Sequence, residues 1–324
     1  MLVDTFQRHH DYLRISITDN CNLRCLYCMP DDHYNFTAPD KLMQVNEITE
    51  IAKIFVKNGV KKIRITGGEP LIRKDVDKIL LNLADLPVKL TMTTNGIRLN
   101  DYIDLMKQTK LLSLNISLDT LCADKYKLIA KRDYFDRVMQ NIKLFVDNNF
   151  HIKVNMVVMK NVNDDEILDF IELTKDRPIH VRFIEFMPFD RNDWQHDKVF
   201  TLDQILNVIN ESYEFTSLCR EPHDTVKKFK IKDHFGTFAV ISTMTSPFCS
   251  DCNRMRLTAD GKMKNCLFSK TETDLLSAFR MGLDIESLIY KNVLSKEKEL
   301  GGQFEVGNVD DSSIVNRSMI SIGG

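Results

Sequence analysis

The sequence predicts an α/β fold: an incomplete (β/α)6 barrel of the TIM type, followed by a C-terminal α+β extension. Two observations lead to this prediction. Between residues 12 and 187, six strand patterns alternate with helical patterns, and each strand pattern has one apolar and one polar face. Strands that alternate with helices at this spacing form βαβ units and a parallel sheet. An open doubly wound sheet is the alternative, because the sequence does not show whether the sheet closes.

The barrel elements follow from periodicity. The strand patterns lie at 12–18, 61–66, 88–94, 111–118, 152–159 and 179–187. Helical patterns lie between them at 46–57, 73–84, 99–108, 135–148 and 164–175. We expect Asn46 to cap the first helix and Gly59 to end it.

The rhythm changes after Phe189. We expect a helix at 201–210, shorter strands at 226–232 and 237–243, a hairpin near Asp260 and Gly261, and helices at 271–280 and 284–295. The tail from residue 301 lacks periodicity. We therefore predict two regions: residues 1–190 form the partial barrel, and residues 191–324 close it.

The polar strand faces indicate what lies inside the barrel. In the first strand pattern, Leu13 and Ile15 alternate with Arg14 and Ser16, and the other five patterns behave alike. A closed TIM barrel fills its interior with Val, Ile and Leu. Here helices must cover the apolar faces, so the polar faces enclose water or a polar ligand. A polar face exposed to solvent is the alternative, and it is typical of antiparallel sheets.

Composition excludes several function classes. The 324 residues are 43% hydrophobic and 28% charged with a net charge of −2, as in ordinary globular proteins. This charge gives no reason to expect general nucleic-acid binding. The first twelve residues lack the apolar core of a signal peptide, and no apolar run has membrane-spanning length. We therefore predict a cytoplasmic protein with neither nucleic acid nor membrane as a partner.

Six of the eight cysteines fall into two groups of three. Cys122 and Cys219 stand alone and are expected to be plain thiols; the groups are Cys21, Cys25 and Cys28, and Cys249, Cys252 and Cys266. Grouped cysteines without an export signal indicate metal binding. Structural zinc and ordinary cubane clusters take four protein ligands. Three thiolates would leave one iron of a [4Fe–4S] cluster open to a small molecule.

Other side chains could complete each group. His33 could be a fourth ligand beside the first group, and Asp251 or His234 could complete a zinc site beside the second. At the end of the second strand pattern, Gly67 and Gly68 would let the backbone approach a ligand, and Glu69 could receive an ammonium group.

Basic residues on the polar faces predict an anionic ligand. The six are Arg14, Arg64, Lys153, Arg182, Arg254 and Arg256. Because strand alternation turns them towards one interior, they predict a polyanionic small molecule, and a triphosphate is the natural candidate.

The motifs resemble a known superfamily. The C-x3-C-x2-C loop with Tyr27, together with the run from Gly67 to Pro70, resembles the radical S-adenosylmethionine superfamily. The run from Arg14 to Pro30, the second group in the form C-x2-C-x13-C with Asn-Arg-Met-Arg directly after its second cysteine, and the terminal Gly-Gly are more specific. They resemble the GTP 3′,8-cyclases of molybdenum cofactor biosynthesis over nearly the whole chain, least so between residues 190 and 249.

The resemblance implies a reaction and its cofactors. The cofactors are two [4Fe–4S] clusters and S-adenosylmethionine, whose amino and carboxylate groups bind the open iron of the first cluster. Its reductive cleavage yields a 5′-deoxyadenosyl radical that takes H3′ of GTP. The C3′ radical then attacks C8, giving (8S)-3′,8-cyclo-7,8-dihydroguanosine 5′-triphosphate. The second cluster is expected to bind the guanine through its own open iron.

The resemblance also assigns site residues. For S-adenosylmethionine they are Tyr27, Gly68, Ser117 and Met187. For GTP they are Arg14, Arg64, Thr93, Lys153, Arg254, Met255 and Arg256, to which the polar strand faces add Arg182. Gly323 and Gly324 are expected to reach the active site and, with Arg14, to assist the radical step.

Three other functions fit part of the pattern. One is a peptide-modifying radical enzyme with an auxiliary cluster, although a peptide would not need six converging cations. The others are an iron–sulfur electron carrier, which would want four cysteines per cluster, and a zinc-stabilised binding module. The sequence names neither the electron donor nor the oligomeric state, for which a homodimer stays open. By pathway, the downstream partner would be a cyclic pyranopterin monophosphate synthase.

Overall fold

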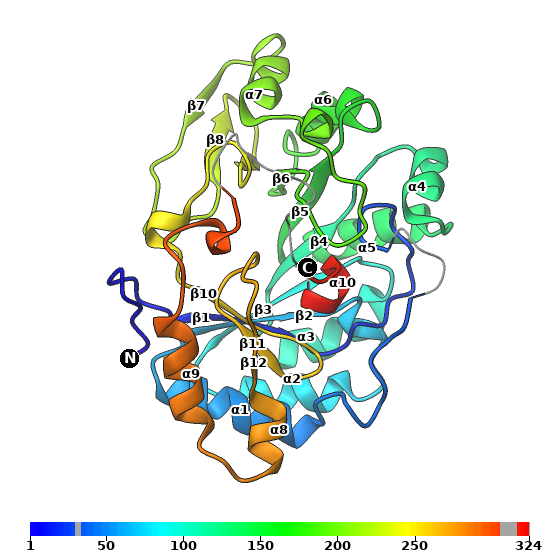
Figure 1. Cartoon of the computed structure of the whole chain (residues 1–324). Coiled ribbons are helices and arrows are strands. Elements are labelled where there is room, and N and C mark those ends of the chain that lie inside the picture. Colours follow the sequence, from blue (N-terminus) through cyan, green and yellow to red (C-terminus); the bar gives the residue numbers. More distant parts are fainter. Residues whose placement is uncertain (30–33, 305–315, 324) are drawn as a thin grey trace.

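The computed structural model describes residues 1–29, 34–304 and 316–323, and its backbone is organised around one twelve-stranded sheet (Figure 1). Six parallel strands form its centre, in chain order: β1 (Tyr12–Ser16), β2 (Lys62–Thr66), β3 (Lys89–Thr94), β4 (Ser113–Ser117), β5 (His151–Val158) and β6 (His180–Glu185). The predicted α/β class with a parallel sheet is confirmed.

The C-terminal region extends this sheet at both edges. β10 (Arg254–Leu257) pairs parallel to β1, and β9 (Thr237–Ile241) pairs parallel to β6. Antiparallel strands continue outward on each side: β11 (Lys262–Lys264) and β12 (Thr273–Asp274) beyond β10, and β8 (Lys227–Ile231) and β7 (Phe215–Ser217) beyond β9. The strand order of the described residues is linear, with β12 and β7 at its two ends.

Helices cover the apolar face of the central strands. They are α1 (Val45–Lys57), α2 (Val76–Ala84), α3 (Ile103–Gln108), α4 (Ala123–Ala130), α5 (Phe135–Asp147) and α6 (Ile167–Glu172). The sequence prediction missed α4. Several of the others are shorter than predicted, because 3-10 turns at 70–72, 99–102 and 164–166 lie at the predicted helix starts or just before them.

The expected cap at Asn46 is wrong. Helix α1 begins one residue earlier, at Val45, with Gln44 at its N-cap. Glu47 explains the shift, because its Oε2 accepts a hydrogen bond from the Gln44 amide at 2.7 Å. The expected end is close, since Asn58 is the C-cap and Gly59 follows with a φ of +102°.

The described part of the C-terminal region contains four further helices: α7 (Leu202–Asn210), α8 (Leu275–Arg280), α9 (Ile285–Leu294) and α10 (Met319–Ile322). The helix expected at 271–280 begins only at Leu275, because Asp274 caps it by accepting from the Ser277 amide at 2.9 Å. The tail, predicted to be irregular, contains α10, which Figure 1 shows at the centre of the picture. None of the described helices combines the length and the apolar character needed to cross a bilayer.

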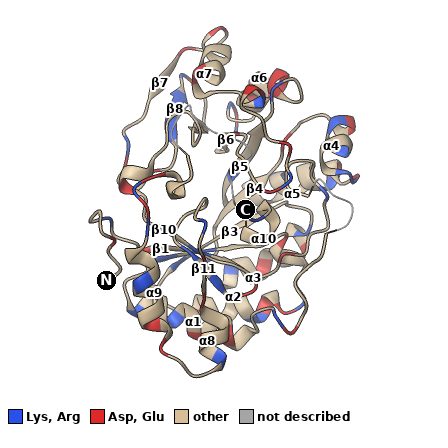
Figure 2. Cartoon of the chain, viewed as in Figure 1, with Lys and Arg blue, Asp and Glu red and all other residues tan. Residues whose placement is uncertain are grey.

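The two strand faces differ as predicted. Ile15, Ile65 and Ile116 are fully buried in the cluster between sheet and helices. The opposite faces of β1 to β6, β9 and β10 all contribute residues to a single pocket. The sheet therefore curves around a cavity to which these faces contribute, and Figure 2 shows basic residues along the central strands.

Candidate active site

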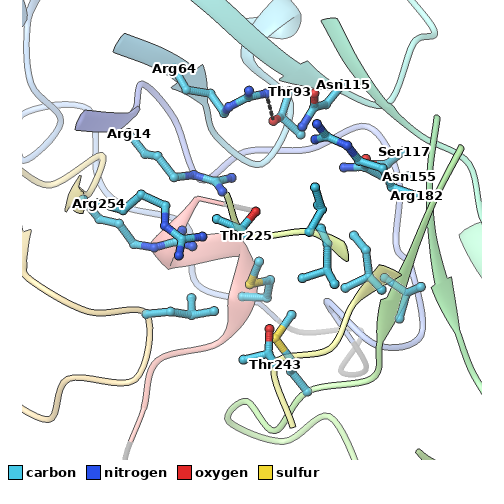
Figure 3. Close-up of a pocket in the computed structure, with 18 of the residues that line it drawn as sticks. Arg14, Arg64, Thr93, Asn115, Ser117, Asn155, Arg182, Thr225, Thr243 and Arg254 are labelled. Carbon is cyan, nitrogen blue, oxygen red and sulfur yellow. Dashed lines mark hydrogen bonds between the residues drawn. The ribbon is translucent and has the colours of Figure 1, made fainter. Parts of the chain in front are cut away.

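The pocket inside the curved sheet has a volume of about 580 Å³. All six cysteines of the two groups line it, so segments more than 200 residues apart share one cavity. Basic and amide side chains from the strands line the same cavity (Figure 3). The predicted convergence of the polar strand faces on one cavity is confirmed.

The loop of Cys21, Cys25 and Cys28 is fixed by backbone hydrogen bonds. The amides of Arg24 and Leu26 donate to the carbonyls of Ala130 and Ile129, each at 3.0 Å. These carbonyls lie in the last turn of α4, so the helix that the sequence prediction missed is the support of the cysteine loop.

Tyr27 connects this loop to β4. Its hydroxyl donates to Asp119 Oδ2 at 2.8 Å, and Asp119 Oδ1 accepts from the Val157 amide at 2.9 Å. Burial raises the pKa of Asp119 to about 6 despite these two hydrogen bonds. Tyr27 therefore orders the loop and lines the pocket at the same time.

Gly67 and Gly68 are required by the protein backbone. A Cβ on Gly68 would lie 2.3 Å from the carbonyl oxygen of Asn20, and one on Gly67 would lie 2.8 Å from that of Thr18. The Gly68 amide donates to Thr18 O at 2.7 Å. The turn after β2 thus packs directly against the segment that enters the cysteine loop, while both glycines still line the pocket.

The expectation for Glu69 is wrong. Its side chain is fully buried and accepts from the amides of Leu71 (3.0 Å) and Asn95 (2.6 Å) and from Thr94 Oγ1 (2.8 Å). Burial raises its pKa to about 7. These three donors occupy the carboxylate, which ties two strand-end turns together instead of receiving an ammonium group.

Six basic side chains line the pocket without carboxylate partners: Arg14, Lys62, Arg64, Arg182, Arg254 and Arg256. Among the described residues, no ion pair joins any of them to Asp or Glu. Figure 3 shows Arg14 and Arg254 pointing into the same region, with Arg64 beside Arg14 on the neighbouring strand and Arg182 on the opposite side. Buried cations without partners are costly, so this wall suits an anion that the described residues do not supply.

Two arginine nitrogen atoms and one phenol show the effect of this excess of positive charge. The Nε atoms of Arg14 and Arg254 are buried without a hydrogen-bond partner in the described part of the chain. Burial, followed by the charges of Arg256 and Arg64, lowers the pKa of Arg14. Burial opposes ionisation of Tyr12, but the charges of Arg64 and Arg14 outweigh it and lower the phenol pKa to about 7.

In the second group, two cations face one thiol. Arg254 Nη2 lies 3.4 Å and Lys296 Nζ 3.7 Å from Cys252 Sγ. Burial opposes ionisation of Cys252, but the charges of Arg254 and Lys296 outweigh it and lower its pKa to about 6. The thiolate form of Cys252, which is the form that binds metal, is therefore favoured, whereas burial raises the pKa of Cys249.

Glu185 holds the segment that leads to Cys249. This fully buried carboxylate accepts from the amides of Met244 (2.8 Å) and Thr245 (3.0 Å), from Thr245 Oγ1, and from the Leu202 amide (3.0 Å). One side chain at the end of β6 thus orders the entry to the second cysteine group.

Neither proposed zinc ligand joins the second group. Asp251 accepts from Arg220 Nη2 at 2.6 Å and from the His223 amide at 2.9 Å. His234 is hydrogen bonded to Thr174 Oγ1 at 2.8 Å, away from the pocket. His33, the alternative beside the first group, lies outside the described residues.

Comparison with known proteins identifies the family. The model of the Radical SAM superfamily matches residues 15–174, and the model described as Molybdenum Cofactor Synthesis C matches residues 179–301. A protein named GTP 3′,8-cyclase from Listeria monocytogenes is 38% identical over 337 aligned positions, which cover 100% of this chain and 99% of that protein. The chain belongs to the GTP 3′,8-cyclase family.

Other members of the cyclase family have further sequence. The mitochondrial GTP 3′,8-cyclase of Arabidopsis thaliana is 43% identical, with 100% of this chain and 84% of that protein covered. Human Molybdenum cofactor biosynthesis protein 1 is 41% identical, but this chain spans only 51% of it. Among solved structures, Streptococcus suis SuiB bound to S-adenosylmethionine has a TM-score of 0.63 at 16% identity, covering 90% of this chain and 69% of SuiB, and shares the fold.

The structure separates the residues expected to serve the cyclase site. Those that line the pocket are Arg14, Tyr27, Arg64, Gly68, Thr93, Ser117, Arg182, Met187, Arg254 and Arg256. Met255 does not, because strand alternation turns its fully buried side chain into the apolar core. Lys153 is not among the lining residues either, and its Nζ donates to Ser113 Oγ at 3.0 Å.

Some lining residues were not assigned a role from the sequence. Asn115 and Asn155 each place a buried Oδ1 without a partner among the described residues. Lys62, Thr225 and Thr243 also line the cavity. The alternation of β2, β4 and β5 already placed Lys62 and both asparagines on the polar face, whereas nothing in the sequence pointed to the two threonines.

The tail reaches the pocket. Arg256 Nη1 donates to Gly323 O at 2.7 Å in a buried hydrogen bond. Met319 and Ile320 line the cavity. Gly324 lies outside the described residues.

Each group offers three free thiols to a metal cluster. All eight cysteines are free, and in each group the neighbouring thiols influence one another electrostatically. In an iron–sulfur cube each cysteine binds a different iron, so three thiols would leave one iron of a [4Fe–4S] cluster without a protein ligand.

Proposed function

We propose that this protein catalyses the radical S-adenosylmethionine-dependent cyclisation of GTP to (8S)-3′,8-cyclo-7,8-dihydroguanosine 5′-triphosphate, the first step of molybdenum cofactor biosynthesis. One observation carries the assignment of an anionic substrate. Six cations without carboxylate partners among the described residues share one cavity with two groups of three cysteines. The names of the full-length relatives identify the substrate as GTP.

We assign a [4Fe–4S] cluster to each cysteine group. Cys21, Cys25 and Cys28 would hold the first, beside Tyr27, Gly68, Ser117 and Met187, which we assign to S-adenosylmethionine. When bound, this cofactor pair supplies a 5′-deoxyadenosyl radical. Cys249, Cys252 and Cys266 would hold the second cluster. The unpartnered Oδ1 atoms of Asn115 and Asn155 suit hydroxyl or amino donors of either bound molecule.

The basic wall would bind and orient the triphosphate. Arg14 and Arg254 each offer a buried Nε with no competing partner among the described residues, so a phosphate oxygen meets donors that need no rearrangement. Thr93 Oγ1, which accepts from Arg64 Nη1 at 3.3 Å, fixes the orientation of a third guanidinium. Arg182 lies beside it (Figure 3). Held this way, the ribose faces the first cysteine group and water is excluded.

We also propose that Gly323, hydrogen bonded to Arg256, keeps the tail at the reacting end of the substrate. Only glycine suits this position, because φ is +84° and a Cβ would lie 2.6 Å from Thr66 Oγ1. Gly324 would extend the same approach.

Several finer points accompany the proposal. The curved sheet would form an incomplete (β/α)6 barrel over residues 1–190, closed by residues 191–324. A cytoplasmic location, an external electron donor and delivery of the product to a cyclic pyranopterin monophosphate synthase stay predictions, and a homodimer stays open. SuiB, which has been solved with its precursor peptide, shares the fold, but the six cations argue against a peptide substrate.

An anaerobic turnover experiment tests the proposal. Reconstituted protein with a chemical reductant, S-adenosylmethionine and GTP should yield 5′-deoxyadenosine and a cyclised nucleotide of unchanged mass, resolved from GTP by chromatography with mass detection. ATP and CTP serve as matched triphosphate controls. Formation of 5′-deoxyadenosine at the same rate with no nucleotide present would remove GTP as the substrate.

A further inference from the structure

The C-terminal tail lies in a position that its own helix cannot maintain alone. Helix α10 has four residues, far fewer than a helix needs to be stable alone. Ile320 and Ile322 are 2% and 1% exposed and supply apolar burial. Apolar burial is not directional, so it does not by itself determine which residue meets Arg256. Something outside the apolar contact must set the register.

Arg317, at the root of this segment, has directional contacts. Its Nη1 and Nη2 donate to Asp260 Oδ1 and Oδ2 at 3.0 and 3.1 Å, and Nη2 also donates to Glu272. Paired donation of this kind fixes both distance and orientation. Asp260 lies in the turn between β10 and β11, and Glu272 directly precedes β12. The root of the tail is thus bound to the sheet edge that carries Arg256.

The neighbouring residue strengthens the same attachment. Asn316 donates from Nδ2 to Leu267 O at 3.1 Å and accepts at Oδ1 from Lys264 Nζ at 3.2 Å. Lys264 is nearly fully buried and also donates to Ser269 O at 2.8 Å. Leu267 directly follows Cys266. The tail root therefore contacts the chain on both sides of the third cysteine of the second group.

We propose that Arg317 is a positioning residue: its ion pair with Asp260 and Glu272 sets the register of the tail and thereby places Gly323 on Arg256. The two carboxylates have no other arginine partner among the described residues. Gly323 follows Arg317 after one short segment, and α10 converts this separation along the chain into a fixed distance. The effect on catalysis rests on the proposed role of the Gly-Gly tail, whereas the effect on tail position does not.

Charge reversal tests the inference. In Arg317→Glu a third carboxylate would face Asp260 and Glu272, and the paired variant Arg317→Glu with Asp260→Arg would restore an ion pair. Arg280→Glu is the matched control, because Arg280 makes a comparable two-point contact with Glu47 (2.6 and 3.0 Å) and neither residue lines the pocket. Hydrogen–deuterium exchange of the Ser321 and Gly323 amides reports tail position directly, since both donate within the tail.

We expect Arg317→Glu to speed exchange of these two amides by about tenfold or more, the factor that corresponds to about 1.4 kcal/mol of docking free energy. The paired variant should restore most of the protection, and Arg280→Glu should leave the tail amides unchanged. The turnover rate should fall with tail protection while the affinity for GTP changes little. Unchanged tail exchange in Arg317→Glu would refute the inference. A released tail with full turnover would instead refute the catalytic role of Gly-Gly and leave the positioning role standing.

Discussion

Replacing Arg14 by Met should change stability and substrate binding in opposite directions. Without ligand, the Arg14 guanidinium is a cation among cations, with its Nε unpartnered among the described residues and its pKa lowered by burial and by Arg256. Removing it relieves like-charge repulsion and an unsatisfied buried donor, which typically costs about 1–3 kcal/mol. The ligand-free variant should therefore be more stable to unfolding than the wild type.

Binding should move the other way. One lost charge-assisted hydrogen bond is worth about 1.5–3 kcal/mol, so the dissociation constant for GTP should rise about 10- to 150-fold. At a GTP concentration of about 100 times the wild-type Kd, ligand stabilises the wild type by about 2.7 kcal/mol. For a variant that binds about 30-fold more weakly, the same concentration supplies only about 0.9 kcal/mol.

The assay is anaerobic unfolding with and without nucleotide, combined with calorimetric titration. Guanosine, which lacks phosphates, should bind the wild type and Arg14→Met equally, and Arg280→Met should behave as the wild type with both ligands. If Arg14→Met binds GTP as tightly as the wild type, the basic wall is not the triphosphate site. If the ligand-free variant is less stable, the argument from unpaired cations is wrong.

Three further predictions concern other parts of the site. Burial, followed by the charge of Arg182, lowers the pKa of Lys153 from its ordinary value of 10.5 to about 6. Between these two pH values the unfolded chain holds a proton on Lys153 that the folded chain lacks. The free energy of unfolding therefore rises with pH over this range. In urea titrations between pH 6 and 8, Lys153→Met should reduce the pH dependence of the free energy of unfolding by at most about 1.4 kcal/mol per pH unit. An unchanged pH dependence would contradict the lowered pKa. Glu185→Gln turns one acceptor into a donor that faces backbone amides, so it should lower the free energy of unfolding by about 1–3 kcal/mol. It should also reduce the iron bound through Cys249, Cys252 and Cys266, while the first group keeps its iron. Equal loss of iron from both groups would argue against this local role. Gly68→Ala should lose iron from the first group, because its Cβ would lie 2.3 Å from Asn20 O. The control Gly282→Ala has open space around it and should lower the free energy of unfolding by only about 1–2 kcal/mol, for its left-handed backbone. Full iron content in Gly68→Ala would show that the contact relaxes freely.

The alternation of side chains between the two faces of each strand is the most informative feature of the sequence. A period of two places every side chain on one of two faces, so alternation alone assigns Arg14, Arg64 and Arg182 to the interior, where the pocket contains them. The same rule excludes Met255, which was assigned by resemblance and lies in the apolar core. Local alternation is therefore the better guide where it disagrees with a motif.

The strand pattern did not predict where a side chain extends from its face or which partners it meets. Lys153 has the correct parity, but its long side chain turns towards Ser113 Oγ and does not line the pocket. Glu69 depends on turns from two different strands, since its acceptors are used by Leu71, Thr94 and Asn95. Such partners are distant in sequence or set by side-chain torsions, and no short-range pattern encodes them.

The two cysteine groups were predicted, but their supports were not. The helix that holds the first loop, α4, has weak apolar periodicity and was missed. The second loop depends on Glu185, which no sequence pattern marks beyond its position at a strand end. Tertiary contacts, not local propensity, determine both.

The central claim is that the pocket holds the GTP ribose where a hydrogen can pass from its C3′ to the 5′-deoxyadenosyl carbon. GTP carrying deuterium only at C3′ tests it directly, with S-adenosylmethionine and a reductant under anaerobic conditions. We predict that mass spectrometry finds one deuterium in the 5′-deoxyadenosine formed and none in the cyclised nucleotide. Unlabelled 5′-deoxyadenosine together with fully deuterated nucleotide would contradict the account.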